Sequence, residues 1–247
     1  MNLPKTYSEE LWKRGGEVES HKQYIGKPYL SWSQVESWRD KKGFNMGNHP
    51  GWLEYMVKYF FGHKFPDMGW GQFGHEVEDY ICEKKGAEFF TDEERETLDK
   101  ISPLGVFQRE VILDFGEFVL LGYIDDHSPV EDNVVSLMVD YKTKSENSKK
   151  DLHDGKKLQL DLYTEYLLRQ GYDVKQVAYV IIERLGGGEC MRGGGRGVLK
   201  VGKRIWHEEY TWSKETIQRA LKIVEKTAQE ISQCYEVFLS LNSDSNQ

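Results

Sequence analysis

Residues 117–142 read EFVLLGYIDDHSPVEDNVVSLMVDYK and contain two β-rich runs around a turn-rich segment. The runs are rich in the branched and aromatic residues that strands favour, and Pro, Asp and Asn lie between them. Both runs end in charged residues, with Asp125 after the first and Asp140-Tyr-Lys142 closing the second. Because consecutive strands usually lie side by side, this stretch predicts a sheet whose charged strand ends share one edge.

The sequence on either side of this stretch completes an α/β pattern. A further β-rich run precedes it, a helix stopped by a glycine follows it, and a continuous apolar run then predicts a buried strand. The predicted elements are the helix 71–81, the strands 106–113, 117–124 and 134–142, the helix 156–170 and the strand 174–183. We therefore expect an α/β fold with a central mixed sheet flanked by helices, in the order helix, three strands, helix, strand.

Three regions follow from this pattern. Residues 1–69 form an N-terminal arm and a helical cap, and Ser31 and Ser33 are both candidates for the N-cap of its first clear helix. Residues 70–184 form the core. Residues 185–247 contain the glycine-rich segment Gly186–Gly197, further strands and a C-terminal helix, and we expect them to belong to the same domain.

The charged strand ends can bind a metal ion. If the two strands pair as a meander, Asp125 and Asp140 meet at one edge, where two carboxylates would repel each other without a cation. With Mg²⁺ they provide the oxygen ligands that this ion prefers, and Lys142 lies on the same face as Asp140. Asp126 is a rival ligand, but strand alternation turns it away from the face of Asp125. The alternative is an ordinary strand end whose charged side chains reach water.

Two further positions can complete such a site. Gln159 and Tyr163 are four residues apart and share one face of the predicted helix. His75 lies on the upstream helix. The structural alternatives are a core tyrosine with a surface amide, and a histidine that has no role as a ligand.

The charge of the chain is unevenly distributed. Its formal net charge is −8, which disfavours non-specific binding to nucleic acid, yet a lysine-rich stretch follows the second charged strand end. The candidate phosphate contacts in this stretch and in the glycine-rich segment are Lys144, Lys149, Lys150, Lys156, Lys157, Arg192 and Arg196.

The remaining composition favours a cytoplasmic protein. The N-terminal residues lack the apolar core of a signal peptide, and no apolar run approaches the ~20 residues of a membrane-spanning helix. The three cysteines, Cys82, Cys190 and Cys234, lie far apart and form no CxxC pair, so we expect reduced thiols.

Taken together, these motifs resemble the PD-(D/E)XK nuclease superfamily, and in particular its RecB-like exonuclease branch. The resemblance covers about residues 70–184, and the Ser31-Trp-Ser33 segment is a fainter match. The motifs that carry it are Gly71-x-x-Gly74-His75, Gly122-x-x-Asp125, Asp140-Tyr-Lys142-Thr143 and Gln159-Leu-x-x-Tyr163. It implies a restriction-endonuclease-like core with the order αβββαβ.

The resemblance also implies roles for individual residues. It implies that Asp125, Asp140, His75 and the carbonyl of Tyr141 bind Mg²⁺ or Mn²⁺, and that Lys142 assists the attacking water. Gln159 and Tyr163 would support the site or contact DNA. Several relatives hold an iron–sulfur cluster on four cysteines, and because this chain has only three, none clustered, we expect no cluster.

The function expected from this resemblance is a metal-dependent DNA exonuclease in recombination, repair or viral replication, in the host cytoplasm if viral. The expected partner is DNA, with a second copy of the chain or a recombination protein as further candidates and no membrane. A structure-specific or single-strand endonuclease on the same scaffold is one alternative. A noncatalytic DNA-binding subunit is another.

Overall fold

The computed structural model describes the whole chain except residues 17, 44–47, 66–68, 146–153, 187–198 and 245–247, and it leaves the side chains of 154–157 and 244 undescribed. Within the described residues, six strands form one mixed sheet in the order β1-β3-β4-β5-β6, and β2 pairs with β3. The strands are β1 (Tyr29–Ser31), β2 (Val106–Asp114), β3 (Val119–His127), β4 (Val134–Ser145), β5 (Asp173–Leu185) and β6 (Lys200–Tyr210).

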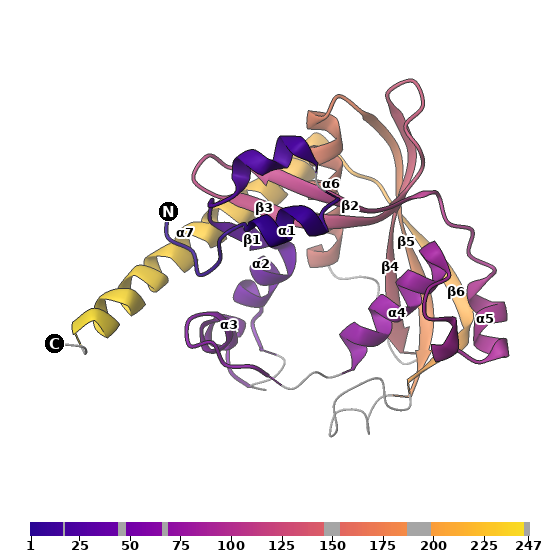
Figure 1. The fold of residues 1–247 in the computed structure, drawn as a ribbon, viewed down its shortest axis with the longest axis horizontal. Helices are drawn as coiled ribbons and strands as arrows, with labels where there is room; N and C mark the ends of the chain where they lie inside the picture. The colour runs from indigo at the N-terminus through magenta and orange to yellow at the C-terminus, as the bar shows by residue number, and fades with distance from the viewer. Residues whose placement is uncertain (17, 44–47, 66–68, 146–153, 187–198, 245–247) are drawn as a thin grey trace.

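Helices cover both faces of this sheet (Figure 1). The helices α6 and α7 pack with α2 on one face, around a large apolar core, whereas α4 and α5 pack on the other face of β4 and β5. The helices are α1 (Glu9–Arg14), α2 (Trp32–Arg39), α3 (Gly51–Tyr59), α4 (Trp70–Glu83), α5 (Asp92–Leu98), α6 (Asp154–Arg169) and α7 (Lys214–Asp244), with short 3₁₀ turns at Glu19–Tyr24 and Ala87–Phe89. The predicted mixed α/β fold, with a central sheet flanked by helices, is confirmed.

Local sequence signals explain where several helices begin. The side chain of Ser31, not that of Ser33, caps α2, and Gln34 completes a capping box by accepting from the Ser31 backbone N–H at 2.7 Å. Thr91 and Glu94 form the same box at the start of α5. No helix within the described residues combines the length and apolarity that crossing a bilayer requires.

The sheet divides between β3 and β4. On the edge of β3 that faces β4, β1 pairs with residues 119–121 and β4 pairs only with Asp126 and His127. β4 instead follows β5 along its whole length. Figure 1 shows β3 and β4 diverging from their point of contact. Residues 122–125 of β3 therefore face an opening in the sheet.

The N-terminal residues close one side of this opening. β1 lies parallel to β3, and its three residues lead directly into α2. The residues before β1 pack against the outer face of β3, where the side chain of Tyr7 is fully buried beside Trp12 and Ile112. The sequence patterns did not predict β1, because three residues are too few to display an alternation.

Candidate functional site

The opening in the sheet places Asp125 beside β4. Its Oδ2 accepts a hydrogen bond of 2.9 Å from the backbone N–H of Tyr141. A side-chain oxygen thus binds a backbone donor at a point where β3 and β4 no longer exchange ladder bonds. This contact holds the carboxylate of Asp125 next to the Asp140-Tyr-Lys142 segment of β4.

Alternation along β4 separates its three polar residues. Asp140 is buried and forms an ion pair with Lys142, whose Nζ also donates to the Tyr141 carbonyl at 3.3 Å. The Tyr141 hydroxyl points to the other face and donates to Asp126 Oδ2 at 3.0 Å. Asp126 also accepts hydrogen bonds from the N–H groups of Leu104 and Gly105, so its oxygens bind a loop and do not face the opening.

Helix α6 brings the predicted Gln/Tyr pair to the same opening. Gln159 Nε2 donates to the Tyr163 hydroxyl at 2.7 Å, and both residues line the cavity described below. Tyr163 packs on the backbone of Gly122: a Cβ added to this glycine would lie 2.7 Å from Tyr163 Cε1. The glycine of the Gly122-x-x-Asp125 motif therefore allows the helix to approach the strand.

Replacing Gly122 by alanine is expected to destabilise the chain by about 1–3 kcal/mol, because the added methyl overpacks against Tyr163. Urea denaturation measures this cost. Gly74→Ala is the matched control, since its Cβ would meet only Thr143 Oγ1 at 3.9 Å. Replacing the ring by a smaller side chain, in Gly122→Ala/Tyr163→Leu, should restore part of the stability. The explanation is wrong if Gly122→Ala alone unfolds at the same urea concentration as the unmodified chain.

Helix α4 contributes His75 and a carboxylate that the sequence patterns did not single out. The side chain of His75 is 80% exposed, and its Nδ1 lies 3.9 Å from Glu78 Oε2. Glu78 is buried and accepts a hydrogen bond from Gln108 of β2. Its only sequence signal was its position three residues after His75, which on a surface helix usually marks a solvated acid.

Burial and mutual repulsion disfavour the charged forms of Asp125 and Glu78. Burial, followed by the charge of Asp140, raises the pKa of Asp125 well above its usual value. Burial also raises the pKa of Glu78 to about 7, with Lys142 opposing and Asp140 adding to the shift. Although burial disfavours its charge, Lys142 has a raised pKa because Asp140 and Asp125 stabilise the ammonium. The opening thus holds more carboxyl groups than one lysine can balance, and Asp125 and Glu78 keep their protons to a higher pH than exposed carboxyls do.

The raised pKa of Glu78 predicts a pH dependence of stability in the metal-free chain. The folded state binds the Glu78 proton more tightly than the unfolded state does, so the free energy of unfolding falls as pH rises from about 4.5 towards and through about 7. Glu78→Gln cannot titrate, and we expect it to be about 1–3 kcal/mol more stable than the unmodified chain at pH 8 in EDTA. Denaturant titrations at pH 5 and pH 8 measure the effect. Glu96→Gln, at an exposed glutamate of α5, is the control, and an equal gain of Glu78→Gln at both pH values would contradict the assignment.

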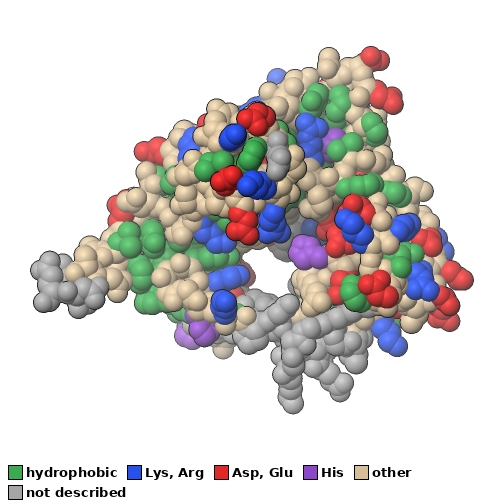
Figure 2. All heavy atoms as spheres, in the orientation of Figure 1, with side chains coloured by type: hydrophobic (Ala, Val, Ile, Leu, Met, Phe, Trp, Pro, Cys, Tyr) green, Lys and Arg blue, Asp and Glu red, His purple; other side chains and the backbone are tan. Residues whose placement is uncertain are grey.

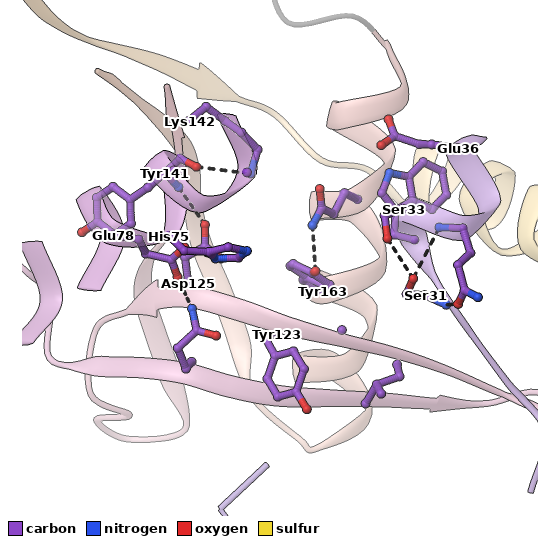
Figure 3. A pocket seen from close by; sticks show the side chains of 18 of the residues that line it. Ser31, Ser33, Glu36, His75, Glu78, Tyr123, Asp125, Tyr141, Lys142 and Tyr163 are labelled. Atoms are coloured by element: carbon purple, nitrogen blue, oxygen red, sulfur yellow. Dashed lines mark hydrogen bonds and ion pairs between the residues drawn. The ribbon is translucent and has the colours of Figure 1, made fainter. Parts of the chain in front are cut away.

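Glu78, Asp125 and Lys142 line a cavity of about 1080 Å³, whereas Asp140 is buried next to Lys142 and is not part of the lining. Figure 3 shows His75, Glu78, Asp125 and Lys142 on one side of it. The N-cap Ser31 and the α2 residues Ser33 and Glu36 lie on the other side, and Tyr163 lies between the two. In Figure 2 the molecule is hollowed between the part that carries α2 and the part that carries α4. Arg184 of β5 lines the same cavity, with its guanidinium 5.0 Å from the centre of the Trp70 ring, and the sequence patterns did not indicate it.

The donor set fits a hard divalent cation in part. Among the described residues, no three His, Cys, Asp or Glu side chains are arranged to hold a metal ion. Mg²⁺, however, needs only one or two carboxylates, with water and phosphate oxygens completing its shell. Asp140 Oδ1 is buried without a hydrogen-bond partner, and a buried acceptor of this kind is costly unless a ligand satisfies it. The two aspartates therefore fit such an ion, whereas the exposed His75 is not held against them by any described contact.

The predicted phosphate contacts fall largely outside the described residues. Lys144 lies near the end of β4 and is half-buried. The structure does not describe the side chains of Lys149, Lys150, Lys156, Lys157, Arg192 and Arg196, so their role stays a prediction.

No protein-family model and no curated protein sequence matches the chain. Among solved structures, it is similar to the crystal structure of a protein named "Putative exonuclease" from Eubacterium rectale, with a TM-score of 0.52 and 16% sequence identity. The similarity covers 95% of this chain and 88% of that chain. At this identity, the match shows that the two chains share a fold.

Proposed function

We propose that the chain is a metal-dependent deoxyribonuclease that hydrolyses phosphodiester bonds, acting from DNA ends. The observation that carries the proposal is the meeting of Asp125, Asp140 and Lys142 at the opening between β3 and β4. The motif resemblance to RecB-like nucleases supports it, as does the name of the structural neighbour. Such an activity would serve recombination, repair or viral replication.

Asp125, Asp140 and the Tyr141 carbonyl are the groups that would hold Mg²⁺ or Mn²⁺, and His75 is the outer candidate. When bound, the ion would polarise a phosphate oxygen and lower the pKa of a coordinated water. The side chains of the chain itself position the substrate. The side chain of Lys142 is 25% exposed and lies next to Asp140. Its ammonium can there stabilise the negative charge that develops on the phosphate.

Helix α6 contributes neutral hydrogen-bonding groups. Because Gln159 donates to the Tyr163 oxygen, the Tyr163 proton is available for a phosphate oxygen in the cavity. Burial raises the pKa of Tyr163, so this proton stays on the ring over the physiological range. Tyr163 is thus a donor that positions the strand, whereas the carboxylates of β3 and β4 bind the metal.

End-labelled linear DNA and circular DNA, each single- and double-stranded, test the proposal with Mn²⁺ and with EDTA. We expect linear DNA to be degraded with Mn²⁺ only, and circular DNA to stay intact. Cleavage of circular single-stranded DNA would assign an endonuclease on the same scaffold. Binding without cleavage under either metal would instead indicate a noncatalytic DNA-binding subunit and would overturn the proposed activity.

A further inference from the structure

A second cavity, of about 670 Å³, lies between α7 and the C-terminal end of α2. We call it the basic groove and define it by its lining residues, Arg39, Glu215, Gln218, Arg219, Lys222, Ile223 and Lys226. Four of the seven are cations and one is an acid, in a chain whose net charge is −8. The sequence patterns did not reveal this concentration, because Arg39 and the α7 residues are about 180 positions apart.

The cations of the groove are exposed to solvent, where a ligand can reach them. Arg219, Lys222 and Lys226 are three and four residues apart and share one exposed face of α7. Within the described part of the chain, neither Arg39 nor Lys222 has an ion-pair partner, and Lys226 lies 3.9 Å from Glu230 on the exposed helix. Arg219 lies close enough to the buried Asp161 to stabilise its charge, and Asp161 also accepts hydrogen bonds from Tyr210 and Thr216, both at 2.7 Å. Glu215 and Asp161 together face four cations, so the groove keeps an excess of positive charge.

Helix α2 connects the groove to the candidate site. Its N-cap Ser31 and its residue Glu36 line the larger cavity, whereas Arg39, less than one turn after Glu36, lines the groove. The helix rises about 12 Å from Ser31 to Arg39 at 1.5 Å per residue. A DNA strand advances about 3.4 Å per nucleotide, so three to four nucleotides cover this distance. A strand held at the candidate site can thus reach the groove.

We infer that the basic groove binds the sugar–phosphate backbone of the DNA strand outside the nucleotides that occupy the candidate site. The inference rests on the proposed function for its substrate. Lysine and arginine side chains that meet phosphates release counterions, and this makes the contact independent of sequence and sensitive to salt. The groove would hold the uncleaved part of the strand while the candidate site acts on its end.

The test compares binding of a 2-nucleotide and a 20-nucleotide single-stranded DNA in EDTA, by fluorescence anisotropy between 50 and 200 mM NaCl. We expect Arg219→Glu/Lys222→Glu to weaken binding of the longer DNA by about tenfold or more and binding of the shorter DNA much less.

In Arg219→Gln/Lys222→Gln, which removes two cations, the slope of log K against log salt should become shallower by about 1.4. Lys100→Glu/Lys175→Glu, on exposed positions outside both cavities, is the matched control. Melting temperatures verify that each variant folds. If the glutamate variant does not fold, the glutamine variant still provides the test.

Two outcomes would overturn the inference: affinity for the longer DNA equal to that of the control, or an equal loss for both lengths. Cleavage by the unmodified chain, measured in parallel, tests the proposed activity separately. Groove-dependent binding without cleavage would leave the groove assigned and remove the activity. Cleavage with no effect of the groove variants would do the reverse, and an unmodified chain that neither binds nor cleaves DNA would reject both.

Discussion

Asp140→Asn should abolish divalent-dependent DNA cleavage, with a loss of roughly 10³-fold or more in kcat, while the chain stays folded. The amide keeps the size of the carboxyl group but neither its charge nor its second acceptor oxygen. Asp140 is buried, and its Oδ1 has no hydrogen-bond partner within the described structure, so the fold does not require that oxygen. Initial rates on end-labelled linear DNA with Mn²⁺ measure the loss.

Asp132→Asn provides a control for the exchange of one aspartate. Asp132 is exposed in the turn before β4, where its φ of 49° is a backbone conformation that asparagine also adopts. This variant should cleave like the unmodified chain. If Asp140→Asn retained more than about a tenth of the activity, the role assigned to β4 would have to be abandoned.

Lys142→Met should lower the free energy of unfolding by about 3–5 kcal/mol in EDTA, the largest stability effect that we expect in the chain. The substitution leaves Asp140 buried next to Asp125 without the ammonium that both carboxylates now face. Urea denaturation in EDTA measures the loss. Mn²⁺ should restore stability to this variant, because a bound cation replaces the missing charge and stabilises the folded state by mass action.

Two further variants separate charge from packing. Lys142→Arg keeps a cation and should lose far less stability than Lys142→Met. Asp140→Asn/Lys142→Met removes both members of the ion pair and should be more stable than Lys142→Met alone, because no uncompensated carboxylate remains at position 140. A double variant as unstable as Lys142→Met would show that lost packing, not charge, explains the effect.

The strands and helices of the core follow from patterns that a single sequence displays. β4 and β5 bury long apolar runs, and the capping boxes at Ser31 and Thr91 begin helices where those residues predict them. β1 could not be predicted, since a strand of three residues exists only because β3 offers a free edge. Local preference is outweighed there by tertiary pairing.

The candidate site was predictable only in part. Alternation correctly separates Tyr141 from Asp140 and Lys142, and helical spacing correctly pairs Gln159 with Tyr163. The sequence patterns did not identify Glu78, because its environment depends on tertiary packing and on a hydrogen bond from Gln108 of β2. Gln108 has a φ of 47°, which no pattern indicates. The divergence of β3 from β4 is likewise invisible in sequence, although it creates the opening. The roles of the individual side chains stay predictions that the variants above test.

The parallel pairing of β1 with β3 has a consequence for how the protein is made. β1 is synthesised about 90 residues before the strand that it pairs with, so it must wait about 5–20 s for its partner to leave the ribosome. Until then α2, which follows β1 directly, has no sheet edge to hold it across the cavity from Asp125. Contacts of such long sequence separation form late and slowly. A growing chain therefore carries the separate parts of the cavity for seconds before they assemble, and the complete cavity forms only after translation has passed β5.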